Sequence, residues 1–159
     1  MARIETSVEI AARPELIFAF FVPQRMPYWY GAEMEVCFEV LGGASEFVVG
    51  SKVRVSGRLA GRPVGHTAVV TAYRWGREFE WRFEDRYGVK GMERWDLEPL
   101  ASAEAERARV SMLSDYTMPG RLGRTLDWLV TRHSVAHRNR DYLARLARLA
   151  AHGKPVKRP

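Results

Sequence analysis

The last long segment of the chain, residues 121–151, limits the possible folds more than any other stretch. Its side chains recur at alternating steps of four and three residues, which places them on one stripe of a helix. The stripe consists of Leu122, Leu126, Leu129, His133, Ala136, Arg140, Leu143, Ala147 and Ala150. Pro119 and Gly120 break the chain before it, and Gly153 and Pro155 stop it. We predict one long helix over residues 121–151, which needs a large apolar surface to lie on.

The segments before this helix alternate apolar and polar residues, which is typical of strands with one buried face. Alternation predicts strands over residues 4–10, 34–40, 53–59, 64–75, 79–84, 89–97 and 108–116. Short turns join most of them, which favours an antiparallel sheet. Pro14 begins a very apolar short helix that Pro23 ends, and an aromatic second short helix or turn follows at residues 26–31.

The length of 159 residues suits one domain, predicted at residues 1–153, with a basic tail at residues 154–159. The lone cysteine, Cys37, excludes an internal disulfide bond and fits a reducing compartment. Acidic Glu5 and Glu9 and the absence of an apolar core argue against a signal peptide, and no apolar run has membrane-spanning length. We therefore expect a cytoplasmic protein.

The positive charge is concentrated at the C-terminal end. The net charge of the whole chain is +6, and residues 120–159 hold ten Lys and Arg residues against Asp127 and Asp141. This basic helix could make weak contact with an anionic membrane or act as an interaction module, or it could simply present a solvated face. No aromatic residue interleaves with the basic tail, so we expect no nucleic-acid partner, and the protein could be a monomer or a homodimer.

The element order of one strand, two short helices, six strands and one long helix resembles the helix-grip fold of the START-related superfamily, also called SRPBCC. Three stretches carry the similarity: residues 4–18, residues 28–30 and residues 116–123. The resemblance implies an α+β fold, in which a curved antiparallel sheet of about seven strands surrounds the C-terminal helix. It also implies a cavity between the sheet and the helix.

The superfamily resemblance implies that this cavity binds, transports or sequesters a hydrophobic or aromatic small molecule, such as a lipid, quinone or polyketide. The alternative is an enzyme similar to the polyketide cyclases and dehydratases. The residues expected to line the cavity are Phe79, Trp81, Phe83, Trp95, Met112, Tyr116, Leu129 and His133. Aromatic and methionine side chains can form an adaptable apolar pocket, but they could equally fill the interior. Nothing in the sequence indicates a cofactor.

Four residues are candidates for proton transfer: His66, Glu93, Tyr116 and Arg140. Glu93 has the same strand parity as Trp95, so it could point inward, where burial would raise the pKa of its carboxyl group. A bulge could instead turn Glu93 to solvent. His66 could be an acid or base, or only a histidine of the cavity wall. Arg140 could pair with an anionic ligand or with Glu93, or extend into water.

Other chemistry has little support in the sequence. His133 and His137 have the spacing of two metal ligands on a helix, but no third ligand is evident, so we predict no metal site. The chain contains neither a phosphate-binding P-loop nor a Gly-x-Ser-x-Gly nucleophile motif. Cys37 is predicted on the solvent side of its strand, and nothing marks it as a nucleophile.

Overall fold

The computed structural model describes residues 2–101, 106–120 and 132–152. The described elements are β1 (Ala2–Ile10), α1 (Pro14–Phe18), the 3-10 helices η1 (Met26–Tyr28) and η2 (Ala32–Met34), β2 (Cys37–Val40), β3 (Lys52–Leu59), β4 (Arg62–Arg74), β5 (Glu78–Asp85), β6 (Lys90–Leu100), β7 (Arg107–Thr117) and α3 (Arg132–Ala151). The sequence predicted this order except for η2 and the exact bounds.

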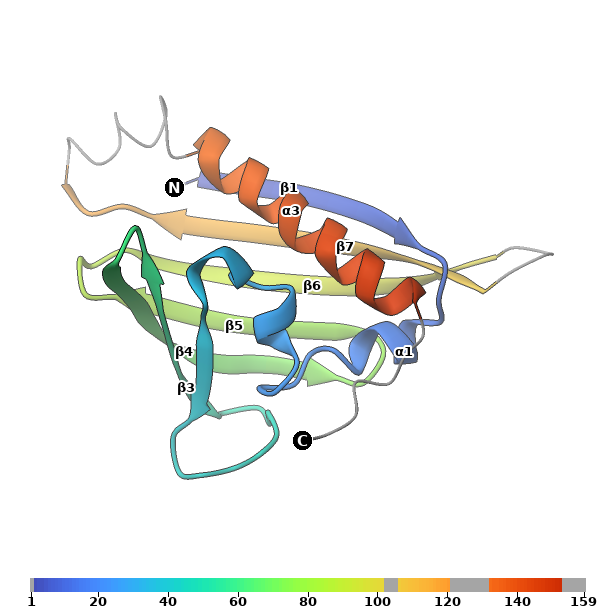
Figure 1. The fold of residues 1–159 in the computed structure, drawn as a ribbon, viewed down its shortest axis with the longest axis horizontal. Helices are drawn as coiled ribbons and strands as arrows, with labels where there is room; N and C mark the ends of the chain where they lie inside the picture. The colour runs from blue at the N-terminus through green and yellow to red at the C-terminus, as the bar shows by residue number, and fades with distance from the viewer. Residues whose placement is uncertain (1, 102–105, 121–131, 153–159) are drawn as a thin grey trace.

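The strands form one antiparallel sheet in the order β1-β7-β6-β5-β4-β3-β2. Pairing of β1 with β7 brings the two ends of the strand region together. A register shift between Val70 and Ala72 interrupts the pairing of β4 with β5, and such bulges bend a sheet. In Figure 1, β2 and β3 cross the direction of β6 and β7. The sheet is therefore curved, with a concave face.

Helix α3 lies across this concave face, over β1 and β7, with α1 near its C-terminal end (Figure 1). The predicted α+β helix-grip architecture is confirmed. The predicted start of the helix, together with Leu122, Leu126 and Leu129, lies outside the described residues.

The helix face that meets the sheet differs from the predicted stripe. The described side chains buried in α3 are Val135, Asn139, Tyr142, Leu143, Leu146 and Ala150. His133 is exposed, so its predicted inward orientation is wrong. Arg140 is also exposed, which agrees with the alternative that it extends into water. Turning the helix to this face buries the large side chains of Tyr142 and Leu146 instead of small alanines, which removes more apolar area from water. Asn139 can enter the interface because Ser114 accepts a 2.9 Å hydrogen bond from its Nδ2.

The segment between α1 and β2 also differs in detail. The predicted strand over residues 34–40 begins only at Cys37, and Met34 belongs to η2. Gly31 and Glu35, with φ of 63° and 49°, flank this 3-10 helix in left-handed conformations that turn the chain sharply. A Cβ on Gly31 would lie 2.8 Å from Val36 Cγ1. This turn lays residues 30–36 against the concave face.

The centre of the concave face is a solid aromatic core. Its main members are fully buried, with ring centroids 5.0–6.0 Å from their neighbours. They are Phe21, Trp29, Phe79, Trp81 and Trp95. Met112 is also fully buried. Three of the aromatic residues expected to line a cavity therefore fill the interior, which is the alternative that the sequence left open.

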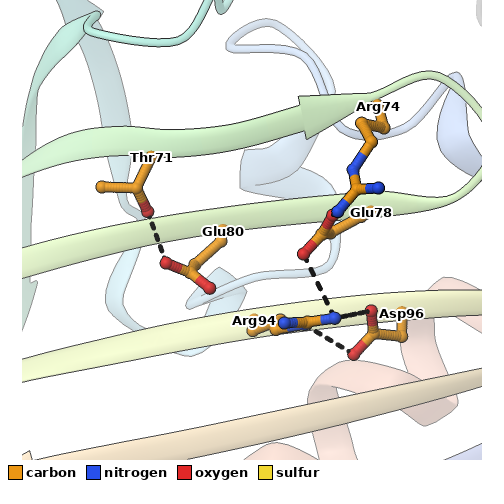
Figure 2. A network of polar contacts seen from close by, with 6 residues as sticks. All are labelled: Thr71, Arg74, Glu78, Glu80, Arg94 and Asp96. Atoms are coloured by element: carbon orange, nitrogen blue, oxygen red, sulfur yellow. Dashed lines mark hydrogen bonds and ion pairs between the residues drawn. The ribbon is translucent and has the colours of Figure 1, made fainter.

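The convex face of the sheet carries charged cross-strand contacts, shown in Figure 2. They link Thr71, Arg74, Glu78, Glu80, Arg94 and Asp96 on three neighbouring strands. Glu78 is only 4% exposed because the guanidinium groups of Arg74 and Arg94 lie against its carboxylate. These opposite-charge pairs stabilise the strand pairing and keep the outer surface polar.

Candidate functional site

A cavity of about 310 Å³ lies beside the aromatic core, between α3, the 30–36 segment and the ends of β3 to β7. This volume is at the lower end of the roughly 300–1,000 Å³ typical of ligand pockets. Apolar residues make up much of its wall: Met34, Val36, Val55, Leu59, Val64, Phe83, Val89, Met92, Met118 and Val135. A small apolar molecule would therefore lose its hydration shell on entry.

Two glycines shape this wall. In the sheet register, Gly91 of β6 lies between Phe83 of β5 and Tyr116 of β7. A Cβ on Gly91 would lie 2.5 Å from Phe83 Cζ and 2.8 Å from the Asp115 carbonyl oxygen. On β3, a Cβ on Gly57 would lie 2.6 Å from the Met34 carbonyl oxygen. The missing side chains let the Phe83 ring lie across β6 and let η2 pack on β3.

Glu93 projects from β6 into the buried end of the cavity and is 6% exposed. Its Oε2 accepts hydrogen bonds from the Tyr30 hydroxyl at 2.7 Å and from Trp81 Nε1 at 2.9 Å. Burial raises the pKa of the Glu93 carboxyl group, although these hydrogen bonds and the charge of Arg138 oppose the rise. Of the two orientations that the sequence left open for Glu93, the structure shows the inward one.

Arg138 of α3 lines the same cavity. Its Nε is buried without a hydrogen-bond acceptor among the described residues. The side chain is close enough for its charge to act on Glu93, Tyr30 and Tyr142, but it forms no ion pair within 4.0 Å with Glu93. The cavity therefore contains a cation whose hydrogen-bonding capacity is not met by the residues that the structure describes.

His66 of β4 lies in the wall with its ring centroid 5.0 Å from that of Phe83. Its Nε2 is buried and has no partner within the described part of the chain. Burial lowers the pKa of His66 to about 4, with Asp85 opposing and Arg138 reinforcing the shift. The imidazole is therefore neutral at physiological pH and could act as a donor or an acceptor.

One edge of the cavity is closed by contacts between η2 and α3. The carboxylate of Glu33 accepts hydrogen bonds from the Tyr142 hydroxyl, at 3.3 Å, and from Arg145. Tyr142 also packs against Tyr30, with ring centroids 4.7 Å apart. These contacts hold the 30–36 segment against the helix, and any enlargement of this edge must break them.

The structure brings only some of the predicted site residues to the cavity. Phe83, Tyr116, His66 and Glu93 lie in its wall. Phe79, Trp81, Trp95 and Met112 belong to the adjacent solid core and do not reach the cavity, although Trp81 holds Glu93. Exposed His133 and Arg140 lie outside it, and Leu129 lies outside the described residues. The binding and catalytic roles of the residues in the wall stay predictions.

Sequence reasoning missed Tyr30, Arg138 and Tyr142, which complete the polar part of the site. A signal for Tyr142 was present in the spacing of Val135, Asn139, Tyr142, Leu146 and Ala150, which form a second stripe on the helix. Arg138 is not a member of this stripe, so its position gave no such signal. Tyr30 gave no periodic signal, because its position depends on the turn at Gly31.

The described residues include no group of three His, Cys, Asp or Glu side chains that could hold a metal ion. Across residues 2–101, 106–120 and 132–152, no helix combines the length and apolar character needed to cross a membrane.

Comparison with known proteins places this geometry in context. Residues 1–151 match the family described as polyketide cyclase / dehydrase and lipid transport. No curated protein matches the chain. Among solved structures, a Rhodobacter sphaeroides protein is similar with a TM-score of 0.71 and 19% identity, over 96% of this chain and 93% of that one. The protein Ara h 8.0201 is similar with a TM-score of 0.67 and 12% identity, over 96% of this chain and 99% of that one.

DynU16, a protein of the dynemicin biosynthetic locus, is also similar, with a TM-score of 0.63 and 19% identity. The similarity covers 96% of this chain but 48% of DynU16. At such identities the solved structures establish the fold alone. The family match, which covers nearly the whole chain, implies a hydrophobic ligand without specifying which one.

Proposed function

Because the chain belongs to the polyketide cyclase/dehydrase and lipid-transport family, we propose that it binds an apolar or aromatic small molecule in the cavity beside α3. A lipid, a quinone and a polyketide are the classes that this chemistry suits. The observation that carries the proposal is the cavity of about 310 Å³, whose wall is mainly apolar and includes a few inward polar groups. Such a combination is typical of small-molecule sites.

Burial of the ligand would supply most of the affinity. A ligand that buries about 200 Å² of apolar area gains roughly 5 kcal/mol, before the cost of association is subtracted. Polar groups such as His66 and Arg138 would orient the ligand. Native mass spectrometry of the purified protein tests this proposal directly, because an apolar ligand should remain bound. If extensive extraction and soaking with apolar compounds give neither a bound mass nor a rise in melting temperature, the proposal fails.

A second function, a cyclase or dehydratase activity on a polyketide, is favoured by one observation. Glu93, with its raised pKa, and neutral His66 line one mainly apolar cavity. A carboxyl group and an imidazole in such a site can transfer protons to and from a bound ketone. Arg140, which is exposed, no longer belongs to this candidate set.

The two functions are distinguished by Glu93→Gln and His66→Gln variants. A binding protein should keep its ligand-induced rise in melting temperature in both variants. An enzyme should lose turnover in at least one of them while binding persists. The predicted cytoplasmic location and the weak contact of the basic helix with an anionic membrane remain separate proposals. A vesicle co-sedimentation assay over a range of salt concentrations would test the membrane contact.

A further inference from the structure

The strongest unexplained feature of the cavity is the partly buried cation of Arg138, whose Nε is fully buried. An arginine in the core of a small domain normally has several of its five N–H groups bound to acceptors. Here Nε is buried without one among the described residues, and the side chain lines the cavity. A buried donor that lacks an acceptor is costly, and a buried charge costs more.

The carboxylates near Arg138 are held by other groups. Glu93 receives hydrogen bonds from Tyr30 and Trp81, both at Oε2, and lies beyond ion-pair distance of Arg138. Glu33 is bound by Arg145 and Tyr142. Neither carboxylate supplies a direct acceptor for the Arg138 guanidinium.

Two further carboxylates line the cavity wall, Asp85 and Asp115. Asp85 Oδ1 accepts hydrogen bonds from the backbone N–H groups of Tyr87 and Val89, at 2.8 and 2.9 Å, within the turn that follows β5. Structural contacts thus hold Glu93 Oε2, the Glu33 carboxylate and Asp85 Oδ1. Arg138 Nε has no acceptor among the described residues, so a ligand in the cavity can supply one.

From these contacts we propose that the ligand is an amphipathic acid: a compact apolar or aromatic body that carries one anionic oxygen group, which Arg138 binds. This inference rests on the proposed function and narrows it to a ligand class. The guanidinium would donate charge-assisted hydrogen bonds to the anion, while Phe83, Val55 and Met92 contact the apolar body. The unpartnered Nε2 of His66 gives the same wall a second polar contact.

The volume of the cavity limits the size of this acid. About 310 Å³ holds a two-ring aromatic acid, whereas a long-chain lipid with two tails requires more space. The cavity also contains only one arginine among its described wall residues. Arg138 can therefore pair with one anionic group of the ligand, and a second anionic group would be buried without a partner.

The experiment compares 2-naphthoate with its neutral analogue 2-naphthamide by isothermal titration calorimetry, using ligand-free protein. The variants are Arg138→Gln and, as the matched control, Arg140→Gln, which makes the same change on an exposed position of the same helix. Wild type should bind the acid about tenfold or more tightly than the amide, as expected for a charge-assisted contact. Arg138→Gln should lose this preference and keep its affinity for the amide, whereas Arg140→Gln should behave as wild type.

The outcomes separate the two proposals. Equal binding of acid and amide by wild type, or an undiminished preference in Arg138→Gln, overturns the inference and leaves the proposed function standing. If wild type binds neither compound, the inference fails, whereas the proposed function is decided by the native mass spectrometry and soaking experiment. Should Arg138→Gln not fold, Arg138→Lys provides the second variant. It retains the charge without the planar fork, so a reduced but persistent preference for the acid is expected.

Discussion

The hydroxyl of Tyr30 donates a 2.7 Å hydrogen bond to Glu93 Oε2, across 63 residues of sequence. The bond joins the turn before η2 to the middle of β6, and both side chains are buried. It keeps a carboxyl group inside an otherwise apolar interior. It also fixes the 30–36 segment, which forms one wall of the cavity.

Tyr30→Phe should lower the free energy of unfolding by about 1–3 kcal/mol, because Glu93 loses one of two donors while remaining buried. The measurement is urea denaturation at neutral pH. Tyr28→Phe removes a hydroxyl from a side chain that is 56% exposed, and it should change stability very little. Equal effects of the two substitutions would show that the Tyr30 bond does not stabilise the fold.

His66 should make the protein less stable in mild acid. Its pKa is about 4 in the folded protein and near 6.5 when unfolded, so the unfolded state takes up a proton first as the pH falls. The free energy of unfolding contains the full contribution of neutral His66 above about pH 6.5. This contribution, at most about 3 kcal/mol, is lost as the pH falls to about 4. Glu93 has the opposite effect: because its pKa is raised in the folded protein, its contribution to stability increases as the pH falls.

The contribution of His66 can be isolated by comparing the pH dependence of unfolding in wild type and His66→Gln. The variant should lose less stability than wild type between pH 6.5 and pH 4, because the group that resists protonation is absent. His133→Gln removes an exposed histidine and should follow the wild-type curve. Parallel curves for wild type and His66→Gln would contradict the burial of a neutral imidazole.

Gly91→Ala should destabilise the fold by about 1–3 kcal/mol and weaken ligand binding, because the new methyl group must displace the Phe83 ring toward the cavity. Thermal unfolding and calorimetric titration measure the two effects. In a Phe83→Leu background, which lacks the atom 2.5 Å from the added Cβ, the same change should cost less. The contact with the Asp115 carbonyl oxygen persists, so the cost should not vanish. A fully additive double mutant would show that the Phe83 ring is not the obstacle.

Glu33→Gln should loosen the edge of the cavity, because the carboxylate that accepts from Tyr142 and Arg145 loses its charge. We expect a stability loss of about 1 kcal/mol or less, since the side chain is partly exposed, and faster ligand dissociation. Stopped-flow dissociation with a fluorescent ligand measures the rate. Glu35→Gln, two residues away and exposed, is the control and should leave the rate unchanged.

Local patterns in the sequence were sufficient for the architecture. Alternation such as that of Phe79, Trp81 and Phe83 depends only on the two-residue period of a strand, so it identified the strands and their buried faces. The same parity made an inward Glu93 possible, although a bulge remained an alternative. The helix was harder, because its buried face shares Leu143 and Ala150 with the predicted stripe but otherwise consists of Val135, Asn139, Tyr142 and Leu146.

The sequence by itself determined the element order, the buried faces of the strands and the family to which the chain is similar, because these depend on short-range periodicity. Only the tertiary structure decided which aromatic side chains fill the core and which line a cavity. That division depends on the bend of the sheet and the rotation of α3, and both are set by contacts between distant segments. The hydrogen bond between Tyr30 and Glu93 and the unpartnered Nε of Arg138 depend on the same long-range contacts, and residues far apart in sequence leave no periodic pattern.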